Sequence, residues 1–394
     1  MTGPSYVPDD ISGLCLPAPC SDSLDILRPR LALELADRAR MLVAISRRKT
    51  KKGSQARRWL DWIENRLRAM DPCQLAICFD PLPAPLDVLN DPDFKDPRPV
   101  LDRAISSIRY LIGSPHSAAA AGVPIPISSC YLPHFHLVLV CEDGPVAVVE
   151  SRSRVEFAWL DGFALTLPKD IGVEVIEGIR NRFYPVHEVR NVPVLNAVPE
   201  VASVFADMGL CAAADIGRAT ARVRDGLDLL RDVWPTAFAA AIRQAKGFVL
   251  LEERGYTRSH SPNCLLGLVA LTADEPATVG DLIIHEMSHI RLNLMRRFDL
   301  LWEDCKPDRV HKSPWRQDLR PLWGLILGIH AFLNVAFYYR RLAQWREGDK
   351  TAHMLYERQT EKVRSAWNTA KPFIRPTDLG ERFFTELERQ VLAL

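Results

Sequence analysis

Apolar residues in the second half of the chain recur mainly at helical spacing. Residues 282–294 carry apolar residues at helical spacing without an internal Gly or Pro, which predicts a helix, and residues 213–233 predict another. Two short apolar runs, 247–251 and 264–271, lie between these helices and predict strands. Residues 321–337 are apolar nearly all round, so a helix formed by them must be buried.

The first half of the chain has a different pattern. Proline clusters there, which indicates loop-rich structure. Residues 23–47 and 59–70 show helical spacing. Between 125 and 175, β-branched and aromatic runs are separated by Asp-Gly pairs at 143–144 and 161–162, and such pairs are hairpin signals.

These patterns predict the fold class and a division of the chain. We expect an α+β protein that is mainly helical, with a small antiparallel sheet beside the two helices that carry the candidate metal ligands described below. Residues 1–200 form an N-terminal region of helices and β-hairpins that could bind a peptide. Residues 201–394 form the region that carries the chemistry.

Composition limits the classes of partner. The chain has 394 residues and a formal charge of +1, which gives no general reason to expect nucleic acid or an anionic membrane as partner. Its nine cysteines are odd in number and scattered, as expected for reduced thiols in a cytoplasmic protein. The N-terminus lacks the pattern of a signal peptide, and polar residues or glycines interrupt the longest apolar run. We therefore expect a soluble, cytoplasmic protein.

The helix predicted over 282–294 contains the pattern His-Glu-x-x-His. His285 and His289 lie one turn apart on the same helical face, so both imidazoles can hold one metal ion. Glu286 lies about 100° round the helix from His285, which disfavours it as a third ligand. It could instead reach a metal-bound water or support a ligand. A preceding strand, as predicted here, is typical of zinc-peptidase-like folds.

A metal site on two histidines needs a further protein ligand, since zinc and non-haem iron sites commonly use three. The spacing of a metzincin would require Gly and His where Leu292 and Met295 stand, so that class is excluded. Glu303 is a candidate of the gluzincin type, but the usual Asn-Glu pattern is missing. His330, in the apolar helix predicted over 321–337, is the candidate that we favour.

Two arginines lie between the predicted metal helix and His330. Arg316 and Arg320 would be one turn apart if the segment were helical, with Asp318 between them. A guanidinium beside a metal can hold a carboxylate through two parallel hydrogen bonds. A structural Arg–Asp pair that braces a loop is the other interpretation, and the pattern alone does not decide between them.

Taken together, HEMSHIRL and the downstream block SPWRQDLRPLWGLILGIHAFLNVA resemble the HExxH-motif peptide-modification proteins of ribosomal peptide natural product pathways. Members of that family are described as iron(II)- and 2-oxoglutarate-dependent β-hydroxylases that act on side chains of precursor peptides. The resemblance covers roughly residues 249–342. Leu319 stands where a Pro would be expected within the Trp-Arg block.

Carried over to this sequence, the resemblance implies His285, His289 and His330 around Fe(II). It also implies Arg316 or Arg320 beside a carboxylate of 2-oxoglutarate, with O₂ as the second cosubstrate and a precursor peptide as the partner. Glu286 would then support a ligand through a hydrogen bond.

Two other classes remain open. In a zinc metallopeptidase, Glu286 would act as the catalytic general base and deprotonate a zinc-bound water. A metal-free scaffold or peptide-binding module would hold no metal at all. The sequence predicts that only the hydroxylase needs an Arg, 2-oxoglutarate, iron and O₂.

Overall fold

The computed structural model describes most of residues 183–394, with gaps at 198–200, 202–204, 207, 264–266, 297–298 and 304–309. Before residue 183 it describes the strands β1 to β6 and isolated residues between 40 and 69. The helices predicted over 23–47 and 59–70 therefore lie largely outside the described residues. The chain forms two compact units: the first comprises Met1–Ile26, Asp215–Ala245 and Glu253–Leu394, and the second comprises Leu27–Ala214 and Lys246–Glu252.

The described part of the second unit is built from short antiparallel strands. One sheet has four strands in the order β1-β4-β5-β6, a second has the order β2-β3-β7, and β8 pairs with β9. The strands and the short helix η4 of this unit are β1 (Ile125–Ile127), β2 (Cys130–Leu132), β3 (Leu137–Leu139), β4 (Val146–Glu150), β5 (Arg154–Ala158), β6 (Ala164–Pro168), β7 (Phe183–Pro185), β8 (Glu188–Val189), β9 (Val192–Pro193), η4 (Leu195–Ala197) and β10 (Gly247–Leu251).

One of the two predicted hairpins is present. β5 and β6 pair antiparallel, with Ala158 opposite Ala164, so the Asp-Gly pair at 161–162 joins them as expected. The prediction for the pair at 143–144 was wrong, because β3 and β4 on either side of it belong to different sheets. An Asp-Gly pair favours a tight turn, but it does not determine which strands pair.

The described part of the first unit is mainly helical, with two small antiparallel strand pairs. This confirms the mainly helical α+β class. Its elements are α7 (Ile216–Val233), α8 (Pro235–Gln244), β11 (Ser259–His260), β12 (Leu268–Thr272), α9 (Pro276–Arg296), β13 (Val310–His311), β14 (Arg320–Pro321), α10 (Leu322–Trp345), α11 (Lys350–Ala370), η6 (Lys371–Phe373) and α12 (Asp378–Leu392). The helices predicted over 213–233, 282–294 and 321–337 correspond to α7, α9 and α10.

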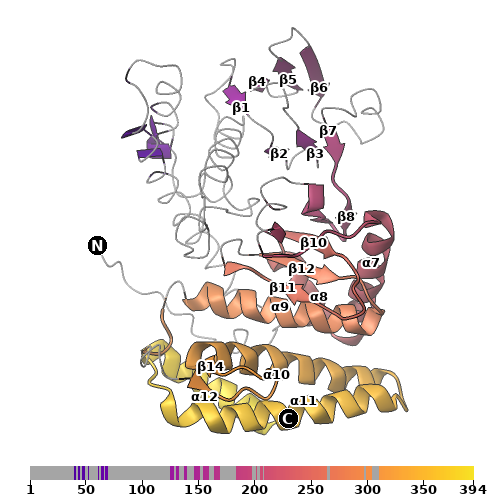
Figure 1. Ribbon diagram of the computed structural model, residues 1–394, viewed down its shortest axis with the longest axis vertical. Helices are drawn as coiled ribbons and strands as arrows, with labels where there is room; N and C mark the ends of the chain where they lie inside the picture. Colours follow the sequence, from indigo (N-terminus) through magenta and orange to yellow (C-terminus); the bar gives the residue numbers. More distant parts are fainter. Residues whose placement is uncertain are drawn as a thin grey trace. The chain divides into compact units, whose positions relative to one another are not determined.

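Helix α9 lies between two layers of this unit. Figure 1 shows β11 and β12 on one side of it and α10 on the other, and α7 and α8 also pack against it. Ile283, Ile284 and Leu292 of α9 point in different directions round the helix and all three are buried, because a helix covered from several sides needs apolar residues on more than one face.

Helix α10 is the core helix of the first unit. It is long and apolar enough to span a membrane by length and composition alone, but 78% of its most apolar window is buried inside the protein. It packs against α9, α11 and α12. This burial is what the sequence predicted for an all-round apolar helix, and it accounts for the apolar composition without a membrane.

A tight connection joins the segment after α9 to the start of α12. Leu301 has φ of 64°, a conformation that is costly for a residue with a side chain. Asp299 holds it there, since its Oδ1 accepts hydrogen bonds from the Leu301 backbone N (2.6 Å) and from Thr377 Oγ1 (2.6 Å). The Thr377 backbone N donates to the Leu301 carbonyl at 3.1 Å. A Cβ at Gly380 would lie 1.6 Å from that same carbonyl oxygen, so this position requires glycine.

Candidate metal centre

The two histidines of the His-Glu-x-x-His pattern converge on one point. α9 has no internal break, so His285 and His289 are stacked one turn apart, and their Nε2 atoms are 3.0 Å from each other. The rings stand nearly perpendicular, at 89°, with centroids 4.6 Å apart. Nitrogens bound to one metal at about 2.0–2.1 Å in neighbouring positions lie about 3 Å apart, so the pair fits two ligands of one ion.

The protonation of the pair also suits a metal. Burial lowers the pKa of His285 well below its usual value, and the charges of His289 and Arg316 lower it further. Burial, together with the charge of Arg316, lowers the pKa of His289 to about 4. Both rings are therefore neutral at pH 7, which is the form that binds metal. His289 Nδ1 is buried and accepts or donates no hydrogen bond within the described part of the chain.

Glu286 points away from the pair and into the strand side of α9. One carboxylate oxygen accepts a hydrogen bond from Ser259 Oγ and the other from Ser261 Oγ, each at 2.6 Å. Its side chain is 3% exposed. Burial raises the pKa of Glu286, while the two serine hydroxyls and the charge of His260 oppose this shift. This Ser–Glu clamp fastens β11 and the residue after it to α9.

An aromatic stack supports His285 from the opposite side. The His285 ring meets Phe332 of α10 edge-on, with centroids 4.6 Å apart. Phe332 in turn stacks on Trp315, with centroids 4.6 Å apart and planes 9° from parallel. Trp315 donates from Nε1 to Gln359 Oε1 of α11 at 3.1 Å. A Cβ at Gly328 would lie 3.3 Å from the Trp315 ring, so Trp315 fits closely over that glycine.

The two candidate arginines have different surroundings. The segment between β13 and β14 is a turn and not a helix, because His311 pairs with Arg320 across an antiparallel ladder; the helical spacing considered for Arg316 and Arg320 is therefore wrong. Arg320 forms an ion pair with Asp318 at 2.9 Å. Arg316 is exposed, lies near enough to act on both histidines, and has no carboxylate partner in the part of the chain that the structure describes.

His330 lies elsewhere on α10. It is fully buried, and its ring faces Phe383 of α12 with centroids 5.9 Å apart. Because Phe332 contacts His285, a residue two positions away points about 200° round the helix. Among the described residues no group of three or more His, Cys, Asp or Glu side chains is placed to hold a metal. The structure therefore brings together His285 and His289 but not His330, whose ligand role stays a prediction.

Sequence reasoning missed the supports of this centre. Ser259 and Ser261 lie in a polar loop and strand with no recognisable motif, and the Trp315–Phe332 stack joins residues that are distant in sequence. The small residue at Gly328, one turn before Phe332, is the one signal that could have indicated a ring packed on α10.

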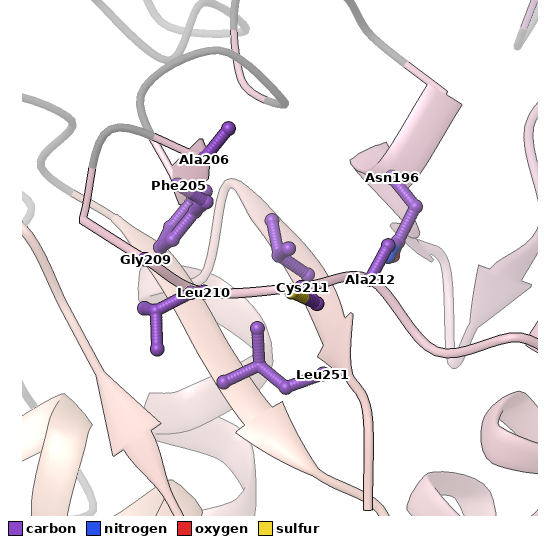
Figure 2. Close-up of a pocket in the computed structure, with 9 residues that line it drawn as sticks. Asn196, Phe205, Ala206, Gly209, Leu210, Cys211, Ala212 and Leu251 are labelled. Carbon is purple, nitrogen blue, oxygen red and sulfur yellow. The ribbon is translucent and has the colours of Figure 1, made fainter.

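A separate apolar cavity of about 350 Å³ lies within the second unit (Figure 2). Phe205, Leu210 and Leu251 form much of its wall, and the exposed residue Cys211 also lines it. Its amide, Asn196, is already bonded to both backbone groups of Leu250, at 2.8 Å each. The described residues therefore give the cavity a mainly apolar lining, with the Asn196 amide already engaged by the backbone.

Comparison with known protein families and with curated proteins finds no match.

Proposed function

We propose that the protein is an iron(II)- and 2-oxoglutarate-dependent oxygenase that β-hydroxylates a side chain in a ribosomally synthesised precursor peptide. The observation that carries this proposal is the exposed Arg316 beside two neutral imidazoles whose Nε2 atoms are 3.0 Å apart. A cation whose charge acts on both imidazoles weakens metal binding, so its presence is best explained by an anionic ligand that binds together with the metal. A dicarboxylate cosubstrate meets that requirement.

In this proposal each residue has a defined task. His285 and His289 hold the metal, and iron(II), when bound, supplies the redox chemistry that couples 2-oxoglutarate and O₂ to hydroxylation of a C–H bond. Arg316 orients a carboxylate of the cosubstrate through charge-assisted hydrogen bonds. Phe332 and Trp315 exclude water from the side of His285 that faces α10.

The position of Glu286 favours this function over a zinc metallopeptidase. A general base must reach the water that it deprotonates. Both oxygens of Glu286 instead accept hydrogen bonds from Ser259 and Ser261. The arrangement supports a positioning role, in which the carboxylate holds β11 against the metal helix.

The remaining parts of the proposal follow from the sequence. His330 is retained as the proposed third ligand, and a peptide-binding role is retained for residues 1–200. The nine cysteines are odd in number and scattered along the chain, which agrees with a reducing compartment, so we place the reaction in the cytoplasm. Nucleic acid is not expected as a partner, because the formal charge is only +1.

The test begins with protein purified without oxygen, loaded with Fe(II) and mixed with 2-oxoglutarate. We expect the charge-transfer absorption of an iron–2-oxoglutarate complex, and succinate release once O₂ is admitted. Arg316→Gln should weaken 2-oxoglutarate binding by about tenfold or more, as expected for a lost charged hydrogen bond. Arg320→Gln is the matched control and should leave binding nearly unchanged, since Arg320 is paired with Asp318.

Mass spectrometry of a co-expressed precursor peptide identifies the product. A gain of one oxygen that depends on 2-oxoglutarate supports the hydroxylase. Peptide cleavage that is abolished by Glu286→Gln, is supported by zinc and is indifferent to Arg316 would instead establish the metallopeptidase. For the third ligand, unchanged iron content in His330→Ala would remove that residue from the site.

A further inference from the structure

The outer edge of β11 carries backbone groups that point away from its partner strand. Ser259 lies opposite Leu271 and His260 opposite Ala270 in the antiparallel pair with β12. The Thr272 N–H donates to the Arg258 carbonyl at 2.9 Å, which marks these two residues as a hydrogen-bonded pair. Hydrogen-bonded pairs alternate with non-bonded pairs, so the N–H and C=O of Ser259 are directed outward. Among the described strands none lies on that side of β11.

This edge is held in a fixed position relative to the metal centre. Ser259 and Ser261 both bond to Glu286, which lies between His285 and His289 on α9. A chain that paired with the edge of β11 would therefore run at a defined distance from the two imidazoles.

The side chains next to this edge favour an acidic partner. Nε and Nη2 of Arg258 are buried without a hydrogen-bond acceptor in the described part of the chain, and the guanidinium carbon lies 5.2 Å from the ring centre of Tyr256. Buried donors without acceptors are costly. Arg258 as a whole is half-buried, so its side chain can turn toward the edge, where a carboxylate would satisfy both donors. Because side chains alternate along a strand, Arg258 and His260 share the face opposite to Ser259. His260 and Tyr256 are exposed, with Tyr256 58% accessible.

We propose that the outer edge of β11 binds the substrate peptide as an added strand, and that an acidic side chain of the peptide pairs with Arg258. Backbone hydrogen bonds to Ser259 would give affinity without sequence preference, and Arg258 would give selectivity for Asp or Glu. The inference rests on the proposed function only in taking the substrate to be a peptide, and it holds for either metal.

The test measures peptide binding to metal-free protein, so it does not depend on iron, 2-oxoglutarate or turnover. Three synthetic nine-residue pools are used, identical except for Glu, Gln or Lys fixed at the centre. We expect immobilised protein to retain the Glu pool about tenfold more than the Gln pool, and the Lys pool least. Arg258→Gln should abolish this preference. Arg224→Gln on the exposed face of α7 is the matched control and should keep it.

A second arm tests the strand geometry. Single peptides recovered from the Glu pool are resynthesised with one N-methyl group at each position in turn. Pairing at an edge predicts loss of binding at alternate positions and tolerance at the positions between them. Equal retention of the three pools, or an unchanged preference in folded Arg258→Gln, would overturn the role of Arg258. Uniform tolerance of N-methylation would overturn the added strand. If these arms succeed while the iron and 2-oxoglutarate assays fail, the peptide site stands and the proposed chemistry does not.

Discussion

Asp281 gives the most quantitative prediction. It lies one turn before His285 on α9, and its Oδ2 accepts a hydrogen bond from Tyr339 of α10 at 2.8 Å. Burial raises the pKa of Asp281 from 3.8 to about 6, against the opposing effects of the Tyr339 hydroxyl and the charge of Arg358. The folded protein therefore holds this proton more tightly than the unfolded chain does. Its contribution to stability is largest at low pH and is lost as the pH rises through about 6.

The size of the effect follows from the two pKa values. At pH 5 the carboxyl is mostly protonated in the folded state and mostly ionised in the unfolded state, which stabilises the fold by about 1.4 kcal/mol. At pH 7 it is ionised in both states and this contribution is nearly zero. Asp281→Asn keeps the acceptor for Tyr339 but cannot titrate. The stability of the wild type relative to this variant should therefore fall by about 1.3 kcal/mol between pH 5 and pH 7.

Urea unfolding of both proteins at the two pH values measures this change, and the comparison cancels other groups that titrate in both. The quantity to compare is the stability of the wild type minus that of Asp281→Asn, measured at pH 5 and again at pH 7. A relative stability that stays constant within about 0.3 kcal/mol, or that rises with pH, would refute the reasoning that burial controls this carboxyl.

Three further predictions concern contacts described above. Ser261→Ala should lower the free energy of unfolding by about 1.5–3 kcal/mol, because it removes a hydrogen bond to a buried carboxylate; a loss below about 0.5 kcal/mol in urea unfolding would contradict the Ser–Glu clamp. Gly280→Ala should lower the free energy of unfolding by about 1–3 kcal/mol, since its Cβ would lie 2.5 Å from the Tyr338 hydroxyl. Gly217→Ala is the control, because its Cβ would meet only Asp215 Oδ1 at 3.5 Å, and it should be neutral or stabilising in thermal unfolding. Phe332→Leu should weaken Zn²⁺ binding, measured by chelator competition, while Phe337→Leu on the same helix should not; equal affinities would show that the aromatic stack does not orient His285.

The sequence was sufficient for features that depend on local periodicity. The helices α7, α9 and α10 follow from apolar spacing, and the meeting of His285 and His289 follows from the pitch of α9. Features that depend on which elements pack together were not available from spacing. The clamp on Glu286 needs β11 to lie over α9, and the choice of Arg316 over Arg320 needs the turn between β13 and β14. Because α10 is apolar on all faces, its sequence does not show which face packs against α9 and which against α12, so the contact of His330 with Phe383 of α12 was not predictable.

Contacts with other side chains of the protein hold the paired imidazoles and their neighbour Glu286 in place. Phe332 restrains His285 from α10, and the serines restrain the adjacent Glu286 from β11. A ligand set that is ordered by such contacts loses little conformational entropy when an ion binds. Metal binding at this centre would then be a late and reversible event, separate from folding, in contrast to small domains whose fold depends on zinc. The same preorganisation would let the centre exchange one divalent ion for another without rebuilding the surrounding helices, so that metal supply in the cell decides which ion it carries.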